Sequence, residues 1–533
     1  MKSIYIFCLI AFSLAFLQSC SKDFLTRDNP TATTDDKWWK NETNVRNALN
    51  LCYGGLPGGW QPDGSLGTAS WTKWRMLYNV LSEETVTGWT WYQNFTLGLA
   101  TPTEWMPDEF YQINYLYIRH CSRFLENYEN AFVQDPERKK QYAAEARALR
   151  AFYHYEAFLL YGEIPVVDKS ITPNESSLAR SSKENLVNFV TSELDAAAPD
   201  LPVSYPDPNE EFRISRAAAY AIQSDMYLNA GEYQKAAQAA RKVIDLNAHE
   251  LHPDYRELFT PAGMRNKERI LFRRRAVYGA FARQMPLFYG CLPNTAPTLN
   301  LINVYETLQG KTIWELGEDS VDIYQRHPKF HNNRDSRLDA TIVVPGDVLY
   351  LGYVPDPYAP DSPESFDKAN ASPTGFWAKK YTHESQAGNI WDNWSDYMII
   401  RYAQVLLNYV EGLVESGDWQ NPDVVKYLNE IRRRAKMPDV DITVYNTEEK
   451  LRELYRRERQ VEFATEGLRI FDIRRWKIGE TVLNGPTYGA VDPATGNPRL
   501  VLTKKFTSPR DYRWPIPQTE MNRNSNIEQN PGW

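Results

Sequence analysis

The spacing of hydrophobic residues predicts helices through much of the chain. Along 141–161 apolar side chains recur every three or four positions, as on one face of a helix: Ala146, Leu149, Tyr153, Ala157 and Leu160. Gly162 and Pro165 end this helix, because glycine accepts the left-handed conformation of a helix end and proline cannot continue the helix. The same spacing predicts helices over 41–53 and 108–128.

Two later segments have the pattern of paired antiparallel helices. Along 215–247 small residues occupy the close-packing positions, and Gly231 supplies a turn between two helices. The segment 400–436 repeats this design more loosely around Gly417. Such pairs resemble tetratricopeptide units, which bury their faces by stacking on one another. We therefore expect tetratricopeptide-like hairpins near 142–161, 215–247 and 400–436, and a mostly α fold.

Three long stretches lack helical periodicity. Residues 56–105, 259–300 and 344–399 are rich in Gly, Pro, Asp or Thr and in aromatic residues. A compact domain rarely carries such long irregular segments unless they have a task. We expect loops with a few short strands, including a hairpin over 488–503, so that the helical scaffold carries one large loop-rich face.

The start of the sequence resembles a secretion signal. Ile4 to Leu17 is an uncharged run, shorter than the roughly 20 residues of a membrane span but long enough for the apolar part of a signal peptide. Leu17-Gln18-Ser19-Cys20 then resembles the bacterial lipobox, whose cysteine becomes lipidated; an ordinary secretory signal is the alternative. We predict three parts of the chain: a signal peptide at 1–19, the lipidated Cys20 with its tether at 20–40, and one domain at 41–533.

Charge and cysteine content exclude several classes of protein. The 533 residues include 60 Lys and Arg against 68 Asp and Glu, a net charge of −8, and no long basic block, so we expect no nucleic-acid partner. Beyond the signal peptide and Cys20, only Cys52, Cys121 and Cys291 remain, and they can form at most one disulfide. Their wide spacing fits buried free thiols better than a disulfide framework.

Signals for metals and cofactors are weak. His249 and His252 lack further nearby Cys or His ligands, and the acidic loops 356–361 and 392–396 lack the glycine and final glutamate of an EF-hand. We predict no metal site and no cofactor, with calcium left open. The arginine-rich run 452–459 has acidic partners at i,i+4 spacing, which indicates a salt-bridged helix face.

Aromatic residues form 13% of the chain, and six of the sixteen tryptophans lie between Trp60 and Trp105. Aromatic faces stack on the C–H groups of sugar rings, while amides and carboxylates bind sugar hydroxyls. The stretch Trp89 to Asn94 offers both, although any single large aromatic can equally belong to the core. We predict ligand contacts from these residues: Trp89, Trp91, Tyr92, Asn94, Trp71, Trp74, Tyr289, Trp391 and Trp394.

A series of motifs resembles the SusD/RagB family of outer-membrane lipoproteins. The first is the helix Glu145 to Tyr155 with the exit turn Leu160 to Pro165. Others follow in the family's order: the hairpin 217–244, Val304-Tyr305-Glu306, Asp335 to Leu338, Arg401 to Tyr409, Leu428 to Arg432, Glu458 to Gly467, Phe471 to Trp476, Pro515 to Pro517 and Gln529 to Gly532. The resemblance covers essentially the whole chain after the predicted signal peptide.

The resemblance implies a helical scaffold whose loop-rich face captures nutrient, without catalytic activity. Members of this family are lipid-anchored on the outer membrane of Bacteroidetes-type bacteria and act with a SusC-like TonB-dependent transporter. Most are linked to glycans, whereas RagB-like members serve peptides. We therefore expect a surface-exposed, lipid-anchored glycan-binding protein with such a transporter as its partner. A peptide binder, a surface glycan hydrolase and a purely protein-binding scaffold are the alternatives.

Overall fold

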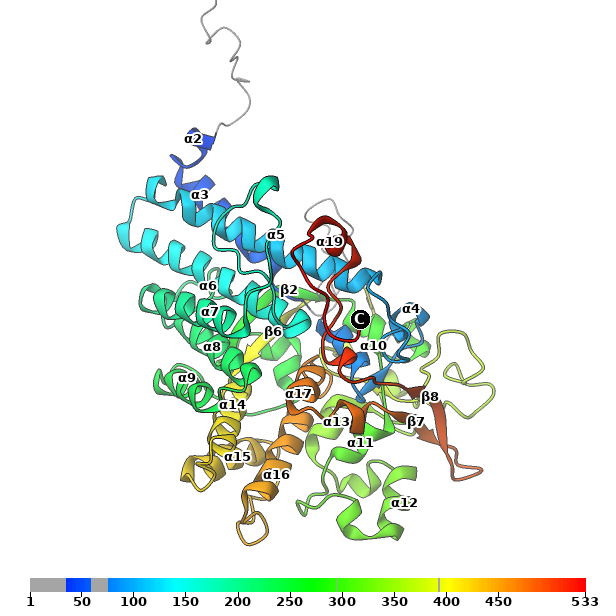
Figure 1. Ribbon diagram of the computed structural model, residues 1–533. Coiled ribbons are helices and arrows are strands. Elements are labelled where there is room, and N and C mark those ends of the chain that lie inside the picture. Colours follow the sequence, from blue (N-terminus) through cyan, green and yellow to red (C-terminus); the bar gives the residue numbers. More distant parts are fainter. Residues whose placement is uncertain (1–34, 59–74, 294, 392–393) are drawn as a thin grey trace, which may run out of the picture.

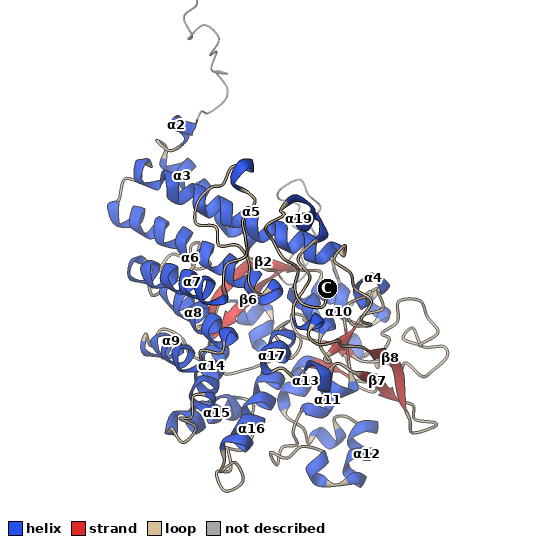
Figure 2. Cartoon of the chain, viewed as in Figure 1, coloured by secondary structure: helices blue, strands red, loops and turns tan. Residues whose placement is uncertain are grey.

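Figure 1 shows the computed structural model, which describes residues 35–58, 75–293, 295–391 and 394–533. Most of the regular structure is helical, as predicted (Figure 2). The long helices gather on one side of the molecule, while irregular loops and the β7–β8 hairpin lie on the other (Figure 2). The predicted combination of a helical scaffold with a loop-rich face is therefore confirmed.

The scaffold is an array of antiparallel helices. Its longer members are α3 (Glu42–Cys52), α5 (Trp105–Asn127), α6 (Pro136–Tyr161), α7 (Lys183–Ala197), α8 (Arg216–Ala230), α9 (Tyr233–Asp245), α14 (Tyr402–Glu415), α15 (Pro422–Arg434) and α16 (Glu448–Glu462). Each helix from α5 to α9 packs on the next, and α14 then packs on α9 (Figure 1). Stacking in this order buries the apolar stripe that each helix pair would otherwise expose.

Helix α6 lies at the centre of the array. The Asp135 side chain accepts a hydrogen bond from the Glu137 N–H at its start, and Gly162, with a φ of 75°, ends it. One of its buried carboxylates, Glu145, is paired with Arg213 at 2.9 Å, which offsets the cost of burying that charge. The motif that opens the family resemblance therefore builds the core of the scaffold.

Shorter elements complete the molecule. The helices are α2 (Asp35–Trp38), α4 (Thr90–Gln93), α10 (Ala280–Gln284), α11 (Leu299–Val304), α12 (Glu318–Arg326), α13 (Ser336–Thr341), α17 (Arg469–Trp476), α18 (Gly479–Val482) and α19 (Gln518–Arg523). The strands pair antiparallel as β1 (Thr85–Val86) with β3 (Ala296–Pro297), β2 (Arg269–Tyr278) with β6 (Trp394–Arg401), β4 (Ile342–Val343) with β5 (Trp377–Ala378), and β7 (Gly485–Val491) with β8 (Pro498–Lys504). The last pair is the hairpin predicted over 488–503.

Strands β2 and β6 join the two sides of the molecule. They enclose the insertion 279–391, which forms much of the loop-rich face and has a small core of its own. At the end of β6 the buried Arg401 guanidinium contacts Glu268 at 2.8 Å, Glu462 at 2.5 Å and Glu466 at 2.8 Å. This ion network fixes the loop-rich side to helix α16.

The structure gives Cys52, Cys121 and Cys291 as buried free thiols. Across the described ranges, none of the helices combines the length and apolar character that a membrane crossing requires. Within the same ranges, no three His, Cys, Asp or Glu side chains are grouped as metal ligands would be.

Candidate ligand-binding site

The structure places the residues predicted to contact ligand in several settings. Trp71 and Trp74 lie outside the described residues. Trp91 lies within α4, and Trp394 is the first residue of β6. The other predicted residues lie on α4 or directly beside it, on the loop after α10, or just before β6.

The predicted residues around α4 include one partly exposed aromatic ring, that of Trp89. Trp89 is partly buried and stacks on Tyr92, with ring centroids 6.0 Å apart and planes 20° apart. Tyr92 is fully buried and also meets the edge of Trp105, so its ring supports Trp89 from within. Asn94 donates to the Glu104 carboxylate at 2.9 Å, and its backbone carbonyl accepts two N–H groups of the following turn. Of Trp89, Tyr92 and Asn94, whose side chains the structure describes, Trp89 is therefore the residue that offers a ring edge to solvent.

A second aromatic group lies on the insertion between β2 and β6. Phe288 and Tyr353 stack face to face with centroids 3.9 Å apart and planes 3° apart. Tyr289 meets Phe288 edge-on and donates from its hydroxyl to the Tyr350 carbonyl at 2.5 Å. Phe288 is 47% exposed, whereas Tyr353 and Tyr289 are half-buried beside it. We call Phe288, Tyr289, Tyr350 and Tyr353 the aromatic platform.

A buried carboxylate holds the aromatic platform in shape. Glu364 accepts hydrogen bonds from the backbone N–H groups of Leu287 and Phe288, at 3.0 and 2.8 Å, and from the Tyr353 hydroxyl at 3.3 Å. Burial raises the pKa of Glu364 above its usual range. Burial also raises the pKa of Tyr353 to about 12, so this phenol stays neutral and can donate or accept hydrogen bonds at physiological pH. One side chain thus fixes both rings of the stack.

Trp391 and Arg283 lie beside each other on the same insertion as the platform. Trp391 is 37% exposed and covers Gly279, where an added Cβ would come within 3.0 Å of its ring. The Arg283 guanidinium on α10 lies 5.5 Å from the Trp391 ring centroid and is close enough to Tyr92 to affect its pKa. Helices α4 and α10 lie on the same side of the molecule (Figure 1). Arg283 therefore lies between Trp391 and the predicted region around α4.

Exposed aliphatic side chains border the platform. Val348, Leu351 and Val354 are 76%, 72% and 46% exposed, and they lie on the same loop as Tyr350 and Tyr353. Leu351 has a φ of 60°, a left-handed conformation that is uncommon for a non-glycine residue. Apolar side chains gathered on one exposed loop are typical of a binding surface.

Tyr289 and Trp391 were named from the sequence as candidates, but Phe288, Tyr350, Tyr353 and Arg283 were not. Tyr350 and Tyr353 lie in a stretch predicted to be an irregular loop. The available signal was the density of aromatics in 281–289 and 350–358. What the sequence could not show is that the fold brings these two segments together.

A separate pocket of about 740 Å³ lies between α11, α16 and β7. It is bordered by Trp314, which is 58% exposed, and by Trp476 and Tyr488. Its arginines are already engaged, since Arg457 donates to Glu306 and Arg469 to Glu83. Of the predicted ligand contacts whose side chains the structure describes, none lies in this pocket.

Two family profiles match the chain in succession. The profile described as "Starch-binding associating with outer membrane" matches residues 70–228, and that of the SusD family matches residues 273–533. Among relatives, SusD-like protein P2 of Formosa agariphila is 27% identical over 83% of both chains. The starch-binding protein SusD of Bacteroides thetaiotaomicron is 24% identical over 84% of this chain and 83% of its own length.

A solved structure agrees with these matches. A SusD-like carbohydrate-binding protein from Bacteroides fragilis superposes with a TM-score of 0.83 at 28% sequence identity, covering 92% of this chain and all of the other. The profiles, the relatives and the shared architecture all indicate one family, which includes a starch-binding protein and a carbohydrate-binding protein. The chain belongs to the SusD family.

Proposed function

We propose that this protein captures an oligosaccharide on its aromatic platform at the cell surface. The observation that carries the proposal is the exposed Phe288 ring, stacked on Tyr353 and fixed from below by Glu364. A preformed aromatic plane loses little conformational entropy when a sugar ring stacks on it. The neighbouring Tyr353 hydroxyl supplies a polar group for sugar hydroxyls.

The family relationship supports glycan over other ligands. The profile over 70–228 is described by starch binding, and the relatives include a starch-binding protein and a carbohydrate-binding protein. Trp89 and Trp391 would widen the stacking surface beyond Phe288, while Trp71, Trp74, Trp91 and Trp394 stay predictions from the sequence.

Anchoring and delivery are further parts of the proposal. Cys20 would carry the lipid that holds the protein on the outer membrane, and a SusC-like TonB-dependent transporter would receive the ligand. The association of the family with the outer membrane supports this location. Labelling of Cys20 with a radioactive fatty acid in the native host, and its loss in Cys20→Ser, would test the anchor.

We also propose that capture proceeds without catalysis. Hydrolysis of a glycosidic bond ordinarily requires two carboxyl groups placed on either side of that bond. The carboxylate beneath the platform, Glu364, is instead occupied by three donors of the protein itself. This arrangement supports a holding surface.

The test is calorimetric titration of the chain from Ser21 to Trp533 against a panel of polysaccharides and oligosaccharides. We expect one class of glycan to bind, with no shorter products on chromatography. Binding should be lost in Phe288→Ala combined with Trp391→Ala, and weakened in Trp89→Ala combined with Trp91→Ala. Phe132→Ala is a matched control, because Phe132 is 53% exposed and hydrogen-bonds through its backbone to Trp39, near the start of the scaffold.

One observation favours peptide as a second ligand class. The exposed Val348, Leu351 and Val354 beside the platform would suit apolar peptide side chains better than sugars. A peptide library titrated under the same conditions separates the two proposals. Binding of peptides but of no glycan, abolished by Leu351→Ser, would replace the glycan proposal.

A further inference from the structure

The scaffold contains a cationic pocket away from the aromatic platform. Its volume is about 300 Å³, and it lies where α6, α8 and α17 end. Four basic side chains line it that form no salt bridge within the part of the chain that the structure describes: Arg474, Arg513, Lys477 and Lys183. Glu163 is the carboxylate that lines it, and this group is engaged by Arg180 at 3.6 Å. The lining therefore carries an excess of positive charge.

Arg474 is buried without a carboxylate partner. Its side chain is 5% exposed, and the hydrogen bond found for it among the described residues is a long one, 3.5 Å to the Leu159 carbonyl. Its Nε has no acceptor. By contrast, many buried arginines of this chain pair directly with carboxylates: Arg337, Arg401, Arg432, Arg459, Arg469 and Arg475. A buried guanidinium with unused donors is costly unless something else satisfies it.

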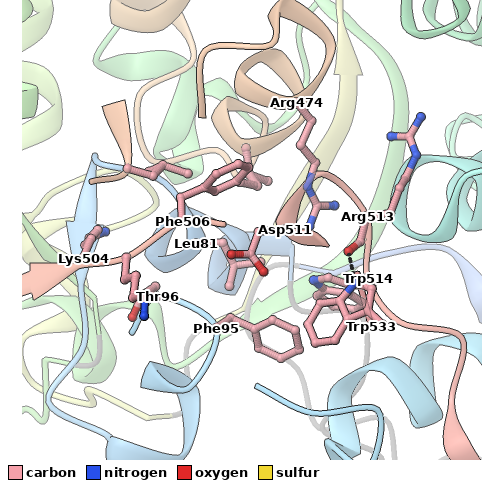
Figure 3. Close-up of a pocket in the computed structure, with 13 residues that line it drawn as sticks. Leu81, Phe95, Thr96, Arg474, Lys504, Phe506, Asp511, Arg513, Trp514 and Trp533 are labelled. Atoms are coloured by element: carbon pink, nitrogen blue, oxygen red, sulfur yellow. Dashed lines mark hydrogen bonds between the residues drawn. The ribbon is translucent and has the colours of Figure 1, made fainter. Parts of the chain in front are cut away.

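Arg513 adds a second guanidinium with few partners. It packs beside Phe158, and its hydrogen bond to the Tyr512 carbonyl is 3.5 Å long. Figure 3 shows Arg474 and Arg513 together at the edge of an adjoining small cavity, near Asp511. No hydrogen bond joins either guanidinium to Asp511 in the described structure, and that carboxylate accepts from Arg510 at 2.7 Å. Among the described residues, neither guanidinium group thus forms an ion pair or a hydrogen bond with a carboxylate, although both lie on one pocket.

Lys477 and Lys183 stand at the exposed rim. Lys477 follows the end of α17 with a φ of 55°, and its ammonium group lies 4.1 Å from the Tyr512 ring centroid. Lys183 donates to the Ala230 carbonyl at 2.5 Å, so the negative end of α8 accounts for that lysine. Arg474 and Arg513 have no comparably short hydrogen bond to a carbonyl among the described residues, since each lies 3.5 Å from its carbonyl oxygen.

The pKa values of the basic groups in this pocket are lowered by burial and by repulsion from neighbouring cations. Burial and the neighbouring Arg513 lower the pKa of Arg474 to about 9. Burial lowers the pKa of Lys477 and of Arg513 as well, with repulsion from Arg513 and Arg474 adding to the effect on Lys477. An anion between these groups would remove the repulsion.

We propose that this pocket binds a doubly charged tetrahedral oxyanion, a sulfate or phosphate group, between Arg474, Arg513 and Lys477. Guanidinium groups present paired N–H donors that match the oxygens of such an anion. The anion is either free or carried as an ester on a sugar. This inference is independent of glycan capture on the aromatic platform, because the two sites share no residue.

The experiment is titration calorimetry of the Ser21 to Trp533 chain at constant ionic strength in chloride buffer. The probes are sodium sulfate, sodium phosphate, galactose 6-sulfate and galactose. We expect sulfate or phosphate to bind, and Arg474→Gln to weaken that binding at least tenfold. The control is Arg523→Gln, which also removes one positive charge but at an exposed position on α19. This variant should bind the anion as the parent does. Binding of galactose 6-sulfate but not galactose would identify the ester as a source; binding of inorganic ions alone would identify the free anion.

Stability measurements distinguish an anion site from a structural role. If the pocket awaits an anion, Arg474→Gln keeps or raises the melting temperature in chloride and loses the rise that sulfate gives the parent. Because Lys477 lies at the exposed rim, the Lys477→Gln protein should fold normally. It should bind sulfate or phosphate several-fold more weakly than the parent. Absence of binding by the parent, or equal binding by parent and both variants, would overturn the proposal. Phe288→Ala should leave the anion response unchanged, so failure of glycan capture and failure of this site remain distinguishable.

Discussion

Phe288 and Tyr353 form a face-to-face stack, with ring centroids 3.9 Å apart, in which the more exposed ring rests on the more buried one. The two residues come from different loops of the insertion 279–391, and Glu364 hydrogen-bonds to both loops. The exposed face of Phe288 is thereby fixed before any ligand arrives. A fixed ring is what a stacking contact requires, since ordering a mobile side chain reduces the gain in binding free energy.

We predict that Phe288→Ala lowers affinity for the captured glycan about tenfold, because truncating a central aromatic contact costs more than about 1 kcal/mol. Phe288→Tyr keeps the ring and should stay within about threefold of the parent. Calorimetric titration with the glycan identified from the panel gives both values, and Phe132→Ala serves as the control. Equal affinity of parent and Phe288→Ala would exclude the platform as the binding surface.

A second prediction concerns the ion network at the end of β6. Glu462 is fully buried and pairs with Arg401 at 2.5 Å and Arg337 at 3.0 Å, and with Arg434. These arginines hold the pKa of Glu462 well below its usual range against the opposing effect of burial. Removing this charge leaves buried guanidinium groups uncompensated, so Glu462→Gln should lower the free energy of unfolding by roughly 3–5 kcal/mol.

Urea denaturation followed by circular dichroism measures this loss. The control is Glu137→Gln, which removes an exposed carboxylate paired with Lys140 and should leave the denaturation midpoint unchanged. Because the pKa of Glu462 is lowered, its contribution is present above pH 4.5 and is lost as the pH falls below that value. A midpoint for Glu462→Gln equal to that of the parent would show that the network adds nothing to stability.

The helices could be predicted from sequence because their signals are local. Asn41, Gly162 and Gly231 stand at helix ends in the structure, where the residue pattern indicated them. Helix α6 begins earlier than predicted, at Pro136, because Asp135 caps it ahead of the apolar stripe. A helix cap depends only on one residue and the next few residues along the chain, so it can be recognised from the sequence alone.

The β2–β6 strand pair was not predicted, because the contacts that define it join residues far apart in the sequence. Strand β2 contains Arg269, Arg273, Arg274 and Arg275, so it lacks a clean alternation of apolar and polar residues. Arg269 is nevertheless buried, because it pairs with Asp396 of the distant partner strand at 2.9 Å. The aromatic platform was only partly predicted for the same reason. Phe288 acquires its exposed stacking position from Tyr353 and Glu364, which lie far along the chain.

A third prediction tests the packing of α14 on α9. At Gly412 an added Cβ would lie 2.8 Å from the Tyr233 carbonyl oxygen and 2.9 Å from the Ala237 Cβ. Backbone atoms of a packed helix cannot easily give way, so Gly412→Ala should destabilise the protein by about 1–3 kcal/mol through overpacking. Gly388→Ala is the control, because no atom lies within 4 Å of the added methyl group. Thermal unfolding measures the stability of both variants. A Gly412→Ala protein at least as stable as the parent would show that α9 and α14 can move apart to accommodate the methyl group.

The last prediction concerns Glu84, a buried carboxyl group near Glu83, Arg469, Lys380 and Lys504. Burial, followed by repulsion from Glu83, raises the pKa of Glu84 to about 8 from an ordinary value of 4.5. The folded protein therefore holds this proton more tightly than the unfolded chain does. Its contribution to stability is complete below pH 4.5 and is lost as the pH rises toward 8.

Glu84→Gln removes this dependence while keeping a neutral side chain that can accept the Thr465 N–H, as Glu84 does at 3.2 Å. We expect the parent to lose roughly 2–3 kcal/mol of unfolding free energy relative to the variant between pH 5.5 and pH 8.5. Urea denaturation of both proteins at these two values measures the difference, and Glu137→Gln should follow the parent. Curves for parent and Glu84→Gln that run parallel across the pH range would mean that Glu84 is ionised in the fold and paired with its basic neighbours.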